Sequence, residues 1–129
     1  MNTPALPDLL LVEPQFVMRR TMVAVAREMR VAEIHEATSV ARALPVLRMR
    51  PFRGLVLDVG DDEAEACSLL EQLRAGDLAS PPDLPVVALA AEWQHELAGK
   101  LDRIPRLRVL PKPFRIRQLL ESLSRMGLG

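Results

Sequence analysis

Two acidic residues and one lysine each follow a short apolar run in this chain of 129 residues. Glu13 follows LLLV, Asp58 follows GLVL, and Lys112 follows LRVLP. An acid at the end of a buried strand is typical of a charged site, and a lysine beside it would balance part of the charge. The residue after Glu13 is Pro14, which is rigid and apolar and has no N–H. The spacing therefore raises the question whether this anionic site works or is the remnant of one.

The segments that must position these residues alternate between short apolar runs and longer amphipathic stretches. The apolar runs predict five strands, most of them apolar throughout, as expected of strands buried on both faces of a parallel sheet. The second run, AEIHE, alternates apolar and polar residues, which indicates an edge strand. The five predicted strands are residues 9–12, 32–36, 54–57, 86–89 and 107–110.

Apolar residues recur between these runs at intervals of three and four, which predicts amphipathic helices. Thr38 or Ser39 can cap the second helix, and Pro45 should kink or break it. The predicted helices are residues 18–29, 40–47, 66–73, 93–104 and 116–123. Five strand–helix units predict an α/β fold, a doubly wound five-stranded parallel sheet with helices on both faces. Such folds bind ligands at the carboxyl ends of the strands, where Glu13, Asp58 and Lys112 are expected.

Composition limits the classes of function. Lys plus Arg and Asp plus Glu both number 17, so bulk binding to nucleic acid or to an anionic membrane is not expected. The single cysteine, Cys67, excludes an internal disulfide, and the N-terminus has no charged-then-apolar leader, which predicts a reduced, cytoplasmic protein. The length predicts a single domain over residues 1–129, with a core at about 8–126 and no separate output domain.

Four stretches of the chain together resemble the receiver domains of bacterial two-component response regulators. They are LLLVEPQFVMRR, GLVLD, LPVVALAAE and LPKPF, and their order and spacing extend over almost the whole chain. The resemblance is closest to single-domain receivers such as the chemotaxis regulator. It implies a flavodoxin-like fold with the strand order 2-1-3-4-5.

The resemblance also implies roles for individual residues. Asp58 matches the phosphoacceptor, and Lys112 matches the lysine that binds the phosphoryl group. Glu13, Asp58 and the backbone carbonyl of Gly60 match the ligands of Mg²⁺, a cation that prefers octahedral oxygen ligands. Three further positions depart from the family's pattern. Pro14 stands where the family has its second acid. Ala90 stands where it has a Thr or Ser hydroxyl, and Val109 where it has an aromatic switch residue.

These departures predict weak Mg²⁺ binding and slow or absent phosphorylation. Removing one preorganised hydrogen-bond donor to a developing anion costs roughly 2.7–4 kcal/mol in barrier. We therefore expect a non-enzymatic pseudo-receiver that acts through protein–protein interaction. One alternative is a working phosphoacceptor in which Glu13, Asp61 or Asp62 completes an atypical metal site. Another is a flavodoxin-like cofactor binder, but the loop after the first strand, EPQF, has no phosphate-binding glycine, serine or threonine.

Each of these residues also has a purely structural interpretation. Asp58 could be a helix-capping or loop acid, and Glu13 could be a plain surface acid. Lys112 is expected to pair with Asp58 whether or not the site is active. For Asp61 and Asp62 we favour acids in the first turn of a helix, where they stabilise its dipole.

A basic segment without acidic residues extends from residue 103 to residue 117. In the family, the corresponding face, made by the fourth helix, fifth strand and fifth helix, binds partners or forms dimers. A basic face there favours an acidic protein partner, such as a histidine kinase or a downstream signalling protein. A homodimer through this face is an alternative, and a solvated face explains the charge equally well. Besides Lys112, the segment contains Arg103, Arg106, Arg108, Arg115 and Arg117.

Overall fold

The computed structural model describes residues 5–60 and 62–127 of the chain. Five strands and five α-helices alternate along it, and a short 3₁₀ helix, η1, precedes the fourth α-helix. The strands are β1 (Asp8–Val12), β2 (Glu33–Ala37), β3 (Gly54–Asp58), β4 (Val86–Ala91) and β5 (Leu107–Lys112). The helices are α1 (Phe16–Glu28), α2 (Val40–Met49), α3 (Glu63–Arg74), η1 (Glu92–Gln94), α4 (His95–Leu101) and α5 (Ile116–Arg125).

All neighbouring strands are parallel, and their order across the sheet is β2-β1-β3-β4-β5. This confirms the predicted fold and strand order. The three central strands are buried along nearly their whole length, whereas β2 and β5 lie at the edges with partly exposed side chains. The predicted edge character of the alternating second run is thus also confirmed.

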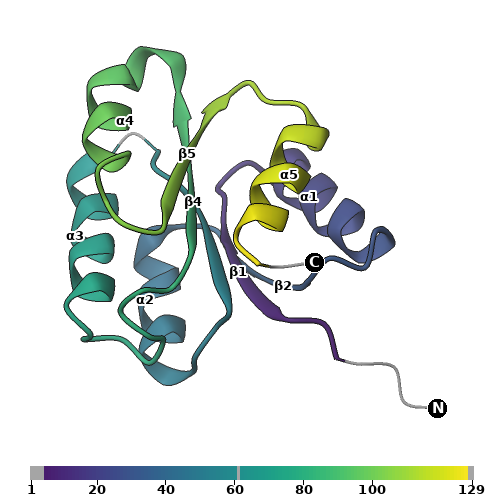
Figure 1. Ribbon diagram of the computed structural model, residues 1–129, viewed down its shortest axis with the longest axis horizontal. Helices are drawn as coiled ribbons and strands as arrows, with labels where there is room; N and C mark the ends of the chain where they lie inside the picture. The colour runs from purple at the N-terminus through teal and green to yellow at the C-terminus, as the bar shows by residue number, and fades with distance from the viewer. Residues whose placement is uncertain (1–4, 61, 128–129) are drawn as a thin grey trace.

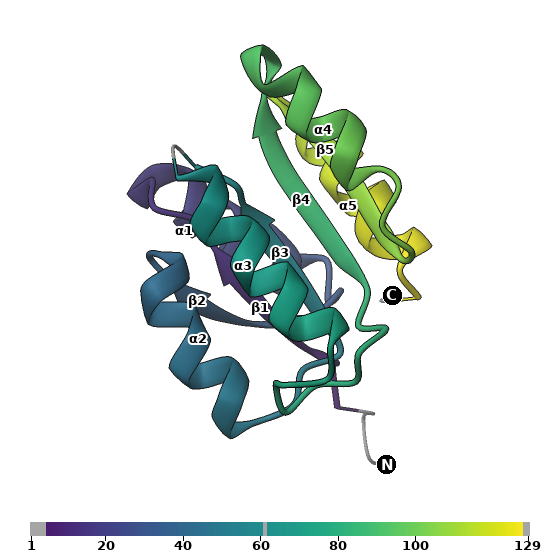
Figure 2. The same ribbon diagram turned by 90° about the vertical axis from the view of Figure 1, so that its left-hand side faces the viewer.

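The helices cover both faces of the sheet (Figure 1). Helices α1 and α5 lie on one face, where Leu9 and Leu11 of β1 belong to the same apolar cluster as Leu119 of α5. Helices α2, α3 and α4 lie on the other face, as the turned view shows (Figure 2). There Leu10 of β1 belongs to a cluster with Leu69 of α3. Burying a leucine side chain fully contributes about 1.5–3 kcal/mol, so the alternation along β1 stabilises both layers.

Helix α2 differs from the expectation at Pro45. The helix continues unbroken from Val40 to Met49 with Pro45 inside it, so a break there is wrong, and a kink at Pro45 stays a prediction. Proline removes one backbone hydrogen bond, to the carbonyl four residues earlier, while the rest of the helix keeps its ladder. The hydroxyl of Ser39 accepts a hydrogen bond from the Arg42 N–H at 3.1 Å, and the buried side chain of Leu47 anchors the apolar face.

The register of the strands brings their carboxyl ends to one edge of the sheet. Val12 lies beside Leu57, so the next residues, Glu13 and Asp58, emerge together. At the other side of β4, Lys112 pairs with Ala91. Within the described ranges, every helix is too short or too polar to cross a membrane.

Candidate functional site

Glu13 lies at the end of β1 with none of its surface exposed. Its backbone N–H donates to the Ala37 carbonyl at 3.1 Å, which extends the pairing of β1 with β2 by one residue. The side chain turns toward β5, where its Oε1 accepts from Lys112 Nζ at 2.5 Å. Its Oε2 accepts from the Gln15 N–H at 3.3 Å. The alternative that Glu13 is a plain surface acid is therefore wrong.

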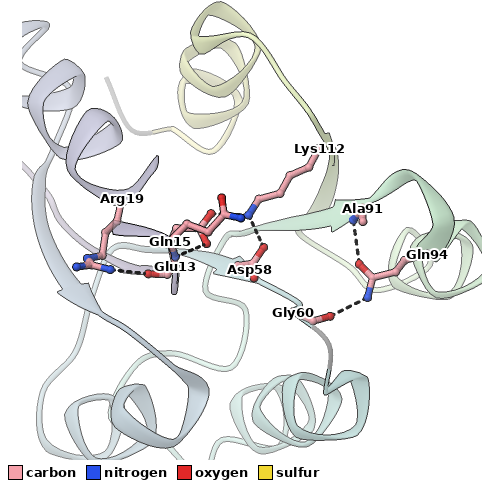
Figure 3. A network of polar contacts seen from close by, with 8 residues as sticks. All are labelled: Glu13, Gln15, Arg19, Asp58, Gly60, Ala91, Gln94 and Lys112. Carbon is pink, nitrogen blue, oxygen red and sulfur yellow. Dashed lines mark hydrogen bonds and ion pairs between the residues drawn. The ribbon is translucent and has the colours of Figure 1, made fainter. Parts of the chain in front are cut away.

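Lys112 bridges the two predicted acids. Its Nζ lies 2.5 Å from Glu13 Oε1 and 2.7 Å from Asp58 Oδ1. The side chains of Lys112 and Asp58 are 18% and 10% exposed, so little water screens the three charges. Figure 3 shows the lysine reaching from β5 across the ends of β1 and β3. The expected pairing of Lys112 with Asp58 is confirmed, and two carboxylates share one ammonium group.

Burial and charge shift the pKa of two of these groups. Burial raises the pKa of the Glu13 carboxyl, and the charge of Asp58 adds to this effect, while the hydrogen bond and charge of Lys112 oppose it. Burial alone would lower the pKa of the Lys112 ammonium group. The hydrogen bonds and charges of Asp58 and Glu13 outweigh that effect, so the pKa of Lys112 is raised. The raised pKa of Lys112 keeps its ammonium group charged at neutral pH.

An arginine holds the end of β1 from the other side. Arg19 of α1 is 9% exposed, and its Nη1 donates to the Glu13 carbonyl oxygen at 3.0 Å. Its Nε donates to Glu36 Oε1 at 3.0 Å, which links α1 to β2. Arg19 was not among the predicted site residues. Arg19 lies one turn into the helix that follows Pro14, and nothing in the sequence distinguishes it from an exposed arginine. Only the structure shows that its side chain is buried.

The positions that depart from the receiver pattern are apolar in the structure. Ala90 is 2% exposed, and its side chain has no hydroxyl group to donate toward Asp58. Ala90 and Val109 line the same hollow, of about 300 Å³, together with His95 and Ala98 of α4. Small side chains at both positions therefore leave open space beside β4. Pro14 is exposed and lines a separate hollow beside Asp58.

Gln94, the last residue of η1, was not predicted to belong to the site. Its side-chain Nε2 donates to the Gly60 carbonyl at 2.8 Å and to Glu63 Oε1 at 3.3 Å. Its Oε1 accepts from the Ala91 N–H at 2.9 Å, so the amide joins the chain after β3 to the end of β4 (Figure 3). In the sequence, Gln94 is one polar residue among several in AEWQHE, and no spacing distinguishes it.

The acids after Asp58 do not add a metal ligand in the described part of the chain. Asp62 is the N-cap of α3, and its Oδ1 accepts from the Glu65 N–H at 3.0 Å, as the favoured interpretation has it. Asp61 lies outside the described residues. Among residues 5–60 and 62–127, no group of three or more His, Cys, Asp or Glu side chains could hold a metal ion. Gly60 adopts a φ of +68°, a left-handed conformation that glycine adopts without strain.

The five arginines of the predicted basic face are exposed. Two of its arginines lie in the loop between α4 and β5, one on the edge strand β5, and two at the start of α5. They are Arg103, Arg106, Arg108, Arg115 and Arg117. In the described part of the chain, none of the five forms a salt bridge with an acidic side chain.

Comparison with known proteins gives matches by structure alone. No protein-family model matches the chain, and neither does any curated protein sequence. One match is the receiver domain of the sensor histidine kinase PA1611 from Pseudomonas aeruginosa PAO1, whose structure has a magnesium ion in its active-site cleft. It aligns with a TM-score of 0.77 and 21% sequence identity, over 95% of this chain and 99% of that one. Chemotaxis protein CheY4 from Vibrio cholerae matches with a TM-score of 0.76 and 21% identity, over 95% and 99% of the two chains.

A third structure, an adenylate cyclase from Rhodopirellula baltica, matches with a TM-score of 0.79 and 17% identity over 94% of this chain and 87% of that one. Identities this low establish the fold and leave the activity open. The strand order and the two layers of helices are those expected for a receiver domain, and the structural matches include receiver domains. The chain therefore has the flavodoxin-like fold of response-regulator receiver domains.

Proposed function

We propose that this chain is an atypical receiver-like module of two-component signalling that acts by binding a protein partner, with weak or no phosphorylation at Asp58. The observation on which this rests is Ala90, a buried residue near the end of β4 that has no hydroxyl group where the receiver resemblance expects a Thr or Ser. Receiver domains are signalling modules, and we accordingly assign this chain no catalytic activity of its own. A cytoplasmic location and a single receiver-like domain remain predictions.

The oxygen atoms available here fit Mg²⁺ poorly. The three that the receiver resemblance assigns to the metal belong to Glu13, Asp58 and the Gly60 carbonyl. One oxygen of each of these three groups already accepts a hydrogen bond, from Lys112 or from Gln94. Mg²⁺ needs close octahedral oxygen ligands and gives up its water reluctantly, so it must compete with these internal donors. We infer that any Mg²⁺ binding is weak, and no step of the proposed function depends on it.

Phosphoryl transfer to Asp58 would also lack a hydroxyl donor. In the family the position of Ala90 contributes that donor, and here it contributes a methyl group. The loss of one such donor costs about 2.7–4 kcal/mol, which corresponds to about a hundredfold to a thousandfold in rate. The absence of an acid at Pro14 adds to this loss. Weak phosphorylation is therefore the upper limit that we expect.

A working phosphoacceptor with an atypical metal site is the second candidate. One observation favours it: Glu13, Asp58, Gly60 and Lys112 line one open hollow of about 250 Å³, which a phosphodonor could enter. A flavodoxin-like cofactor binder has no comparable support, because the loop after β1 offers no phosphate-binding residues.

Phosphorylation itself separates the two candidates. The protein would be incubated with acetyl phosphate and Mg²⁺, and acyl phosphate would be measured by intact mass, with Asp58→Asn as the control. We expect little or no modification of the natural chain, and a clear gain for the double variant Pro14→Asp/Ala90→Thr. Rapid modification of the natural chain that Asp58→Asn abolishes would exclude the pseudo-receiver. A double variant that stays unmodified would contradict the roles given to Pro14 and Ala90.

We further propose that the basic face binds an acidic protein. A twofold homodimer would place the same surface patch against itself, so Arg108 and its neighbours would face other arginines. Like charges brought together in an interface are unfavourable, which favours a different, acidic partner such as a histidine kinase or a downstream protein. Reversing Arg103 and Arg117 to glutamate should leave the fold intact and abolish binding of the acidic partner protein. If both reversals left partner binding and the monomer–dimer equilibrium unchanged, this face would be neither a partner surface nor a dimer interface.

A further inference from the structure

The side-chain amide of Gln94 connects two segments that both border the hollow beside Asp58. Gln94 is 4% exposed although it is a polar residue in a short 3₁₀ helix. Its Nε2 lies 2.8 Å from the Gly60 oxygen, and its Oε1 lies 2.9 Å from the Ala91 nitrogen. Both partners belong to the rim of the same hollow, as does Gln94 itself. A buried amide with good donor and acceptor partners is held in one orientation, because leaving those partners unpaired is costly.

The two ends of this amide have different consequences. The bond from the Ala91 N–H to Oε1 caps the start of η1, and this role alone would explain why the residue is a glutamine. The bond from Nε2 to the Gly60 carbonyl is not part of the cap, because it crosses from η1 to the segment after β3. It places a positively polarised N–H group against the carbonyl oxygen. The hydrogen bond occupies one of the two lone pairs of that oxygen. A cation approaching the same oxygen would be repelled by the amide protons, and would bind less tightly beside them or have to displace them.

We infer that Gln94 is a latch that keeps divalent cations away from the hollow beside Asp58. The latch holds the Gly60 carbonyl with Nε2 and is itself oriented by the Ala91 N–H. Lys112 performs the corresponding role for the carboxylates of Glu13 and Asp58. This inference deepens the proposed function and rests on it, because it identifies the residue that keeps metal out of an otherwise acidic site.

Substitution of Gln94 would release the carbonyl while leaving the two acids in place. Breaking one hydrogen bond of about 0.5–1.5 kcal/mol before the ion can bind corresponds to about a twofold to tenfold loss of affinity. Gln94→Ala should therefore bind Mn²⁺ about twofold to tenfold more tightly than the natural chain does. Gln94→Glu has the same shape but presents a carboxylate near Gly60 and Glu63, and should bind Mn²⁺ more tightly still.

The test would measure free Mn²⁺ by electron paramagnetic resonance during titration of the full chain. Fluorescence gives a second readout, since Trp93 is the only tryptophan in the sequence and lines the same hollow. Gln118→Ala is the matched control. The Gln118 side chain accepts from the Arg115 N–H at 2.7 Å at the start of α5, so this variant loses the same kind of cap far from Gly60.

The latch is supported if Mn²⁺ affinity increases in the order natural chain, Gln94→Ala, Gln94→Glu, with Gln118→Ala equal to the natural chain. Equal affinities in all four proteins would overturn it, as would tight binding by the natural chain. Thermal unfolding without metal shows which variants are folded. If Gln94→Ala is not folded, Gln94→Glu, which keeps the shape of the side chain, still tests the inference. The measurement does not involve phosphorylation, so the latch can fail while the phosphorylation assay still supports the pseudo-receiver, and the reverse holds too.

Discussion

Lys112→Met should be the most damaging single substitution in the charged site. It keeps an unbranched side chain that is one atom shorter, and it removes the ammonium group that contacts Glu13 and Asp58. Glu13 is buried, so its carboxylate would lose its charged partner with little water to replace it. Removing one partner of a buried ion pair typically costs about 3–5 kcal/mol. Since small domains are stable by only about 5–15 kcal/mol, a large share of the total stability would be lost.

Urea unfolding, followed by circular dichroism at pH 7, would measure this loss. For a domain of this size, about 3–5 kcal/mol corresponds to a decrease of roughly 10–25 °C in the melting temperature. Lys100→Met is the control, because Lys100 is the only other lysine in the chain and is exposed. Exposed substitutions of this kind change stability by less than about 0.5 kcal/mol. A double variant, Glu13→Gln/Lys112→Met, replaces the stranded carboxylate with a neutral amide and should recover part of the stability.

The defect should also depend on pH in a defined direction. The pKa of Glu13 in the folded chain is raised above its ordinary value of 4.5, mainly by burial, and Lys112 limits the increase. A raised pKa means that the folded state retains a proton that the unfolded state has lost. This group therefore contributes stability below pH 4.5 that is lost as pH rises through the folded pKa. Without Lys112 that loss becomes larger, so the difference between Lys112→Met and the natural chain should grow from pH 4.5 toward neutrality.

Three results would refute this reasoning. In the first, Lys112→Met and Lys100→Met are equally stable at pH 7. In the second, the double variant with Glu13→Gln is no more stable than Lys112→Met alone. In the third, the defect is as large in acid as at neutral pH. Each would show that the acids at this rim reach water or another cation when the lysine is gone.

Two further predictions concern residues outside the triad. Arg19→Met should lower the free energy of unfolding by about 1–3 kcal/mol, because its buried guanidinium group donates to the Glu13 carbonyl and to Glu36. Arg20 is exposed and also pairs with Glu36, so Arg20→Met should lower the free energy of unfolding by less. Urea unfolding of both variants checks this, and equal losses would contradict it. Cys67 should react slowly with iodoacetamide at pH 7, since burial and the nearby acids raise the pKa of its thiol above 9.0; a rate equal to that of free glutathione would contradict this.

The sequence was sufficient to predict the fold and the meeting of the charged residues, for the same physical reason. Parallel strands of similar length end at one edge of a sheet, so residues that follow three different strands must come together there. Apolar runs locate those strand ends to within one or two residues, and the expected contact between Asp58 and Lys112 follows from that alone. The strand register then determines which neighbours are adjacent, as with Val12 and Leu57.

The burial of Glu13 and the roles of Arg19 and Gln94 could not be predicted in this way. Each depends on where a long side chain turns after it leaves the backbone, and that direction is decided by hydrogen-bond partners that are distant in the sequence. Gln94 is separated from its partner Gly60 by 34 residues, and no periodic pattern connects the two.

The same argument explains why the fold can survive the loss of receiver chemistry. The strand-end acids and lysine satisfy one another, so the charged rim has a structural reason to persist when metal and phosphoryl group are absent. Lys112 neutralises part of a site that would otherwise hold two buried or half-buried carboxylates, and the amide of Gln94 satisfies the carbonyl of Gly60, two residues after Asp58. Charged residues at this rim are therefore weak support for catalysis on their own. Whether the rim still performs chemistry depends on how readily the internal donors yield to an external cation, and the Mn²⁺ titration measures that property directly.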